Sequence, residues 1–423
     1  MSLDRTKAPL FSLPVDFSLQ APQQLVLACG TTLFYVPTPG IDAVKLEIIG
    51  KSDRNALPLT QALVPYFTLQ LLQEGTQRAN SREIAEFFDF HAAEVHPLLS
   101  YSHEGLSLLC LKKHLGKLLP MFISLFSEAT FPANFVEKRK SQHKLSLSLE
   151  REKPSSRASQ LFKKCLFGAQ HPYGQEITED HVNSITPEIL QSYYSSHLWK
   201  SCDLFLCGDF TDSELYHLCS QLNALPFKGA VENFDAMQVN READVYEDRP
   251  LAPQSSLRIG AWSISKKHPD FPMLSIANAL FGGFFGSRLV KNIREEKGHT
   301  YGITSSLMHL ADYNYWVVAA DVKKEFRKEV IADIHQEMKR LQEELVSEQE
   351  LEVLRNYLIG QLINKFSSPF DTIDQFKAVY QLGLDFSYFD KRWKLLQSFT
   401  AEDILHTSRS HLRSEACLEV CVG

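Results

Sequence analysis

Apolar positions along the first part of the chain change from strand-like to helix-like spacing. Apolar runs between residues 25 and 50 are broken by glycine and proline, and helical spacing follows over residues 57–73. Asn80 and Glu83 then form a capping-box pattern for a further helix. The later pattern predicts a strand near 105–111, a helix near 115–127, and a long helix that begins near residue 134.

The second part shows the same mixture of spacings. Its pattern predicts strands over 257–264, 301–308 and 315–322, and helices over 273–281 and 325–345. A further helix should begin at the Ser347/Glu350 capping pattern and continue to about residue 366. Because strands and helices do not alternate strictly, we expect an α+β fold with mixed or mainly antiparallel sheets and helices packed on them.

Two distant segments repeat each other at a constant offset of 214 residues. "ITPEILQSYYSSHLWKSCDLFLC" (185–207) and "FTAEDILHTSRSHLRSEACLEVC" (399–421) are identical at seven of 23 positions, where ordinary composition gives about one or two. Each copy opens with a threonine suited to cap a helix, Thr186 or Thr400, and ends in an apolar strand. We interpret the chain as a duplicated unit, with homologous halves at 1–225 and 255–423 and a polar linker at 226–254.

The segment "FGGFFGSRLVKNIREEKGHTYGITSS" (281–306) is rich in glycine but matches neither a dinucleotide-binding loop nor a P-loop. Ser287 is placed to cap a helix, and Gly298 stands where a left-handed residue would end it. Arg294 should therefore lie near the end of a helix and Tyr301 at the start of a strand. The short connection between them could direct both side chains to one place.

Composition narrows the possible partners and location. The 423 residues suffice for two or three domains, and a net charge of −7 with a pI near 6.1 argues against nucleic acid or an anionic membrane as the main partner. No run approaches 18 apolar residues, and no signal peptide is recognisable at the start of this sequence. Eight scattered cysteines without a C-x-x-C pair suggest reduced thiols and a cytoplasmic location, with a previously removed signal peptide as the alternative.

Several blocks resemble the insulinase/pitrilysin family of zinc peptidases, which includes the mitochondrial processing peptidases. These blocks are "SRLVKNIREEKGHTYGI", "LLQEGTQRANSREIAEFFDFHAAEVHP" and "LFGAQHPYGQEITEDHVNSITPEIL". They occur in the family's order, and the resemblance extends from about residue 25 to the end of the sequence. It implies two similar halves that enclose a central chamber for peptides.

The resemblance also shows where the zinc motif is missing. Active members carry H-x-x-E-H, with two histidines as zinc ligands and a glutamate as general base. The matching positions here hold Tyr66, Leu69 and Gln70, none of which suits its role. The third ligand would come from the next long helix, where the expected region offers Ser146 and Ser148, with Glu150 as the nearest acid. We therefore expect no metal and no cofactor in this chain, and zinc in a partner chain.

A substitute metal site is the alternative to a lost one. Its candidates are His91, Glu94, His96, His103 and Glu104, which are close in sequence but do not follow a metal-binding spacing. His171, His197 and His411 are expected to serve the fold.

In contrast to the zinc motif, the family's substrate-binding pair is retained. The resemblance gives Arg294 and Tyr301 the role of holding the substrate's backbone near the metal. We expect Gly282, Gly283 and Gly286 to let this segment approach a substrate backbone closely.

Three functions remain possible. The favoured one is a non-catalytic, substrate-gripping subunit of a two-chain zinc peptidase, paired with a homologous zinc-bearing subunit or forming a homodimer. The second is a structural or peptide-binding pseudoenzyme without a proteolytic partner. The third is a peptidase with an unrecognised metal site. All three involve peptide rather than nucleic acid or membrane.

Overall fold

The described residues form two separate β-sheets in one chain. The computed structural model describes residue 6 and residues 19–231, 239 and 243–423. The sheet of the first half has the strand order β1-β2-β6-β3-β5-β4. Its strands are β1 (Gln23–Val26), β2 (Thr32–Pro37), β3 (Ala43–Lys51), β4 (Glu94–Leu99), β5 (His103–Leu111) and β6 (Asp203–Gly208).

The sheet of the second half repeats this arrangement in the order β7-β11-β8-β10-β9. In each half one neighbouring pair is parallel, β2 with β6 and β7 with β11, and the other described pairs are antiparallel. The expected α+β fold with two homologous halves and mainly antiparallel sheets is therefore confirmed. The strands are β7 (Val245–Glu247), β8 (Gln254–Trp262), β9 (Thr300–Leu310), β10 (Tyr313–Lys323) and β11 (Leu418–Val422).

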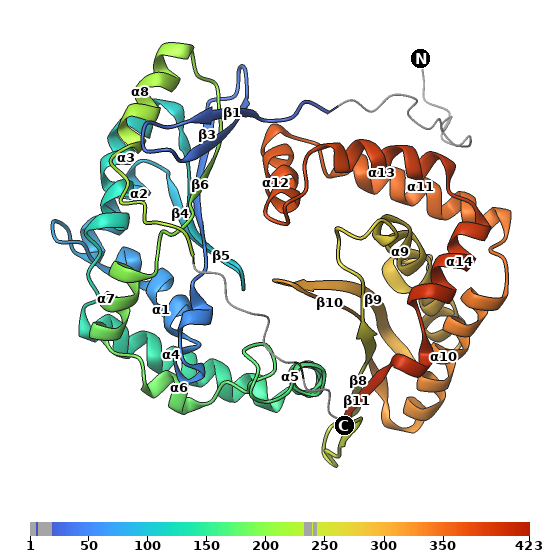
Figure 1. The fold of residues 1–423 in the computed structure, drawn as a ribbon. Helices are drawn as coiled ribbons and strands as arrows, with labels where there is room; N and C mark the ends of the chain where they lie inside the picture. The colour runs from blue at the N-terminus through green and yellow to red at the C-terminus, as the bar shows by residue number, and fades with distance from the viewer. Residues whose placement is uncertain (1–5, 7–18, 232–238, 240–242) are drawn as a thin grey trace.

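Helices surround both sheets, and the two halves lie side by side around a central region (Figure 1). The helices of the first half are α1 (Val64–Leu71), α2 (Ser81–Phe90), α3 (Lys112–Ser127), α4 (Ala133–Glu152), α5 (Pro154–Phe167), α6 (Glu179–Asn183), α7 (Pro187–Ser196) and α8 (Asp212–Leu222). Those of the second half are α9 (Phe271–Asn278), α10 (Arg327–Glu343), α11 (Glu348–Asn364), α12 (Pro369–Tyr380), α13 (Ser387–Ser398) and α14 (Ala401–His411). Within the described part of the chain, every helix is too short or too polar to cross a bilayer.

The repeated segments occupy equivalent places in the two halves. Thr186 and Thr400 are the N-caps of α7 and α14, and each threonine side chain accepts a hydrogen bond from a backbone N–H in the first turn. Each helix is followed by the strand that takes part in the parallel pair of its sheet, β6 beside β2 or β11 beside β7. The offset of 214 residues thus relates elements of the same kind in the same order.

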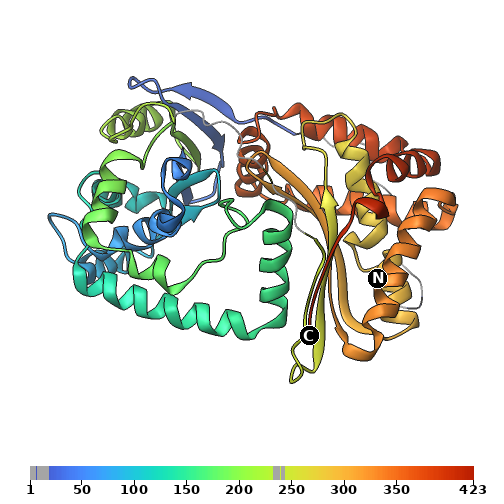
Figure 2. The same ribbon diagram turned by 60° about the horizontal axis from the view of Figure 1, so that its bottom comes forward.

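Each half also contributes a helix to the sheet of the other half, which the sequence pattern does not reveal. Helix α5 packs on β8 and β11, where Leu161 and Phe162 share an apolar cluster with Tyr315 and Val420. Helix α12 packs on β2 and β6 of the first half (Figures 1 and 2). The domain boundaries at 225 and 255 stay a prediction, because parts of the 226–254 linker lie outside the described residues.

Aromatic packing and ion pairs hold α12 on the first sheet. Phe376 lies 4.8 Å from the ring of Phe34, measured between centroids, and belongs to a buried cluster that includes Phe205. Beside this cluster, the ammonium of Lys45 lies 2.7 Å from an Asp374 carboxylate oxygen. The Coulombic attraction of nearby carboxylates, despite burial, raises the pKa of Lys45. The two halves are therefore fixed to one another by contacts distant in sequence.

Two predicted helices are shorter in the structure, one because of its prolines and one because it continues as a π-helical turn. The helix expected over 57–73 is a short α-helix flanked by 3₁₀ turns, because Pro58 and Pro65 fit only at the starts of such segments. The helix expected over 273–281 ends as an α-helix at Asn278 and continues as a π-helical turn, Ala279–Gly283. The remaining predicted strands and helices are found within a few residues of their expected positions.

Candidate functional site

The three positions of the missing zinc motif lie on α1, but they do not share one environment. Leu69 is 1% exposed and belongs to the core of the first half, whereas Tyr66 and Gln70 are only half-buried. The ring of Tyr66 contacts those of Phe67 and His143, with centroids 5.5 and 5.3 Å away. A phenol, an aliphatic side chain and an amide offer neither a zinc-ligand pair nor a general base, so this helix does not fit zinc.

His143 is the residue of α4 whose ring contacts the motif helix. Ser146, Ser148 and Glu150, the residues considered for the third ligand, are all exposed. The Glu150 carboxylate accepts hydrogen bonds from Lys153 and Ser156, and these bonds lower its pKa. The face of α4 that meets the motif helix therefore carries His143, and the expected place of the third ligand stays a prediction.

Sequence reasoning missed His143, although the spacing of four residues between His143 and Leu147 indicates that they share one face of a helix. The two residues are four apart, and both face the motif helix from α4. The Nε2 atom of His143 is buried and has no hydrogen-bond partner among the described residues. Burial and the nearby charge of Arg139 lower the pKa of His143, which favours the neutral imidazole.

A cavity of about 700 Å³ opens beside Tyr66 and His143. Its walls come from α1, α4, α5, the loop after β4 and, in the second half, β8. This volume lies within the ~300–1,000 Å³ that small-molecule sites commonly have. The cavity therefore occupies the region of the lost zinc motif and offers space for a short peptide segment.

Arg294 and Tyr301 lie next to each other, as the sequence predicted. The guanidinium carbon of Arg294 lies 5.6 Å from the centroid of the Tyr301 ring and 4.6 Å from that of Phe285. Tyr301 is 88% exposed and Phe285 is 65% exposed. Neither Arg294 nor Tyr301 belongs to the residues that line the cavity. Phe285, which completes this exposed group, was missed because an aromatic residue within a glycine-rich segment has no distinctive spacing.

The glycine-rich segment has a different structural basis from the one expected. A Cβ atom at Gly282 would lie 2.8 Å from the Cβ of Ser305, so this buried glycine lets the π-helical turn pack on β9. The expectation that Gly282 approaches a substrate backbone is thereby corrected, whereas Gly283 is exposed and its role remains a prediction. Ser287 was expected to cap the next helix, but its buried hydroxyl has no hydrogen-bond partner among the described residues.

The helix that carries Arg294 ends in a wide turn and a left-handed glycine. Val290–Glu296 is π-helical, and the Lys297 N–H donates to the Asn292 carbonyl five residues earlier. Gly298 has a φ of +66°, as expected for the residue that ends the helix. The wider turn and the glycine together set the direction in which Arg294 and Tyr301 project.

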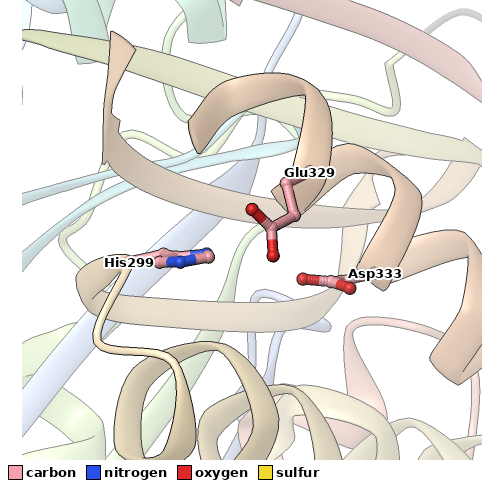
Figure 3. Close-up of side chains that lie close together, drawn as sticks. All are labelled: His299, Glu329 and Asp333. Carbon is pink, nitrogen blue, oxygen red and sulfur yellow. The ribbon is translucent and has the colours of Figure 1, made fainter. Parts of the chain in front are cut away.

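A group of polar side chains anchors this connection to α10. His299, Glu329 and Asp333 lie close enough to hold a cation (Figure 3). The Lys297 ammonium lies 2.7 Å from one Asp333 oxygen and 3.3 Å from a Glu329 oxygen, so a side-chain cation already neutralises these acids. We interpret the group as a salt-bridged anchor for Gly298 and assign no metal to it.

The histidine candidates for a substitute metal site are dispersed among separate contacts. His91 bonds to the Phe87 carbonyl, and His96 pairs with Glu94. His103 and Glu104 begin β5, and burial lowers the pKa of His103 to about 4. Among the residues that the structure describes, these side chains form no group with metal-ligand geometry.

The two repeated histidines make equivalent structural contacts. His197 lies 2.8 Å from an Asp53 carboxylate oxygen, and His411 lies 3.0 Å from one of Asp270. His171 is buried and stacks on Phe167. The expected structural role of these three histidines agrees with their contacts.

Residues 184–358 match the family described as the peptidase M16 inactive domain. A relative named "Non-peptidase homolog YmxG" from Helicobacter pylori is 23% identical over 369 residues, covering 85% of this chain and 83% of the relative. The "Uncharacterized zinc protease YmxG" of Bacillus subtilis is 21% identical over 345 residues, covering 80% and 83%. The chain is similar to M16 proteins described as inactive or non-peptidase, which agrees with its resemblance to a degenerate insulinase-like protein.

Solved structures agree with this M16 fold. A peptidase M16 inactive domain from Pseudomonas fluorescens superimposes with a TM-score of 0.82 at 22% identity, covering 95% of this chain and 98% of that one. The ferredoxin protease FusC, solved in complex with Arabidopsis ferredoxin, gives a TM-score of 0.76 at 14% identity. The match covers 98% of this chain but only 47% of the FusC chain. This chain thus corresponds in fold to about half of that larger protein.

Proposed function

We propose that this chain is a non-catalytic subunit that grips peptide for a homologous, zinc-bearing partner chain. The observation that carries the proposal is the group formed by Arg294, Tyr301 and Phe285. Among the described residues, the Arg294 guanidinium has ring contacts but no hydrogen bond or ion pair, and the Tyr301 hydroxyl has no hydrogen bond. Their donors are therefore available to a ligand.

The chemistry of these donors suits a peptide carbonyl. Five N–H groups on a guanidinium and one phenolic O–H can donate to a carbonyl oxygen that gains negative charge during hydrolysis. The chain itself lacks a residue at position 69 that could activate water, since Leu69 is an alkyl side chain in the core. The zinc ion and the general base would be supplied by the partner.

The length of the chain favours a partner of similar size. FusC contains about twice the length of this fold in a single chain, since the present chain covers 47% of it. Two chains of the present kind would supply the same amount of structure. A second copy of this chain would not supply zinc ligands, so we favour a homologue with an intact H-x-x-E-H motif over a homodimer.

The test is a peptidase assay on this chain, on the zinc-bearing homologue, and on their mixture, with a fluorogenic peptide. We expect no hydrolysis by this chain alone and activity in the mixture. Arg294→Ala or Tyr301→Phe should lower turnover by the mixture by about 10²-fold, the usual cost of losing one transition-state donor. Gel filtration should show that both variants still assemble.

Two substitutions provide matched controls. Arg413→Ala removes another exposed arginine, and Tyr216→Phe removes the hydroxyl of another exposed tyrosine. Neither should change turnover. If mixtures with the Arg294 and Tyr301 variants hydrolyse peptide as fast as the mixture with the unchanged chain, the pair has only a structural role. That result would favour a scaffold without proteolytic function.

A further inference from the structure

The cavity beside Tyr66 has a charge opposite to that of the whole protein. The chain carries a net charge of −7. The cavity is nevertheless lined by five cationic side chains and one carboxylate. They are Arg54, Arg151, Arg157, Lys163, Arg258 and Glu150.

The carboxylate and one of the cations are neutralised by neighbours outside the lining. Arg157 forms ion pairs with Glu176 and Glu247, at 3.2 and 2.8 Å. Glu150 pairs with Lys153 at 2.9 Å. These pairs leave the other four cations as the source of the cavity's positive potential.

Those four cations have no carboxylate within ion-pair distance among the described residues. Arg258 donates to the backbone carbonyls of Ser155 and Leu257 and to the hydroxyls of Ser159 and Ser256, and burial lowers its pKa. It therefore contributes mainly positive charge to the cavity. Within the described ranges, the Arg151 side chain donates a single, long hydrogen bond of 3.5 Å, to the carbonyl of Ile177. Lys163 has no side-chain hydrogen bond or ion pair within the described part of the chain.

Arg54 shows most directly that the cavity wall has unused hydrogen-bonding capacity. Its guanidinium carbon lies 5.1 Å from the centroid of the Tyr101 ring. Its Nε atom is buried and has no hydrogen-bond partner among the described residues. Buried donors of this kind are costly unless a ligand or water satisfies them. The unpartnered Nε2 of His143 lies in the wall of the same cavity.

Clustered like charges repel one another in a concave, partly desolvated site, and an anionic ligand relieves the repulsion. We propose that this cavity binds an acidic peptide segment, with Asp or Glu carboxylates held by Arg54, Arg151 and Lys163 and attracted by the charge of Arg258. Guanidinium groups suit carboxylates because they donate two parallel hydrogen bonds. The proposal names the substrate class and rests on the proposed function only in taking the ligand to be a peptide.

The shape of the cavity favours a peptide over a small anion. The four cations come from the 3₁₀ turn Arg54–Ala56, α4, α5 and β8, so they surround the space from separate elements. Between them lie apolar and aromatic side chains, including Leu99, Leu147 and Tyr173. A segment with alternating acidic and apolar residues would satisfy both kinds of wall, whereas a single phosphate would leave most of the cavity unfilled.

The test measures binding by the full chain alone, by fluorescence anisotropy of labelled eight-residue peptides. One peptide alternates Glu with Leu, and its control has Gln in place of each Glu. We expect the acidic peptide to bind at least tenfold more tightly and to weaken as salt is raised. Lys163→Gln should weaken it about tenfold, and Lys163→Arg should retain most of the affinity.

Lys164→Gln is the matched control, because Lys164 lies next to Lys163 on α5 but does not line the cavity. Equal binding of the Glu and Gln peptides, or an equal loss from Lys164→Gln and Lys163→Gln, would overturn the proposal. Displacement of the peptide by equimolar inorganic phosphate would assign the cavity to a small anion instead.

This test is separate from that of the proposed function. Arg294→Ala should leave the preference for the acidic peptide unchanged, because Arg294 does not line the cavity. Acidic-peptide binding without any activity in the mixed-chain assay would contradict the proposed function but support the cavity assignment. Activity in the mixture without a preference for the acidic peptide would support the proposed function and contradict the cavity assignment.

Discussion

The position of the missing general base allows a direct test of how completely the zinc site has been lost. Leu69→Glu restores a glutamate at that position, but Leu69 is 1% exposed and belongs to the core of the first half. Loss of the buried leucine should cost about 2 kcal/mol. Burial should also raise the pKa of the introduced carboxyl by about two units, equivalent to roughly 3 kcal/mol at neutral pH. The expected decrease in the free energy of unfolding is therefore about 4–5 kcal/mol.

Urea unfolding at pH 7 and at pH 4.5 measures this effect and its sign. A carboxyl with a raised pKa in the folded state keeps its proton over a pH range in which the unfolded chain has already released it. The variant therefore loses stability as the pH rises above about 4.3, the ordinary pKa of glutamate. The penalty should therefore be larger at pH 7 than at pH 4.5. Leu69→Met, the control, should cost less than about 1.5 kcal/mol. A penalty below about 1 kcal/mol at pH 7 would mean that position 69 reaches solvent.

Two further predictions concern the packing of the halves and the response to acid. Phe376→Ala should lower the free energy of unfolding by about 3–5 kcal/mol, because Phe376 is 7% exposed in the cluster that joins α12 to the first sheet. The control Phe90→Ala, at an 85% exposed position, should cost almost nothing. Equal losses of the two variants in urea unfolding would contradict this packing. His103, with its pKa lowered to about 4, stays neutral in the folded state while the unfolded state binds a proton below about pH 6.5. The protein should therefore lose up to about 3 kcal/mol between pH 6.5 and 4. His103→Gln should reduce this loss in pH-dependent unfolding, and an unchanged acid response would refute the assignment.

The sequence predicts the fold well where local signals and the repeat agree. The capping box at Asn80 and Glu83 and the N-caps at Thr186 and Thr400 are formed as expected. Gly298 is left-handed because the chain must turn sharply between a helix and β9. These features depend on a few neighbouring residues, which is why they can be read from sequence.

Features that depend on tertiary contacts could not be predicted. The exchange of α5 and α12 between halves depends on which sheet each apolar helix face meets, and periodicity does not specify that partner. The buried hydroxyl of Ser287 and the packing of Gly282 on Ser305 follow from the π-helical turns, which have no clear sequence pattern.

Only some residues of the candidate site could be found from the sequence. The resemblance led to Tyr66, Leu69, Gln70, Arg294 and Tyr301. In contrast, the contact of His143 with Tyr66 and the gathering of cations around the cavity require the folded chain. Arg54 and Arg258 are about 200 residues apart in sequence, so no local motif could have joined them.

The central claim is that this chain has no catalytic metal centre of its own. The most direct test is elemental analysis of the purified chain after incubation with zinc and removal of free metal, with peptide hydrolysis measured on the same sample with and without a chelator. We predict no stoichiometric zinc at α1 and no chelator-sensitive hydrolysis. One tightly bound zinc per chain that is lost on Gln70→Ala, together with hydrolysis that a chelator abolishes, would contradict the account.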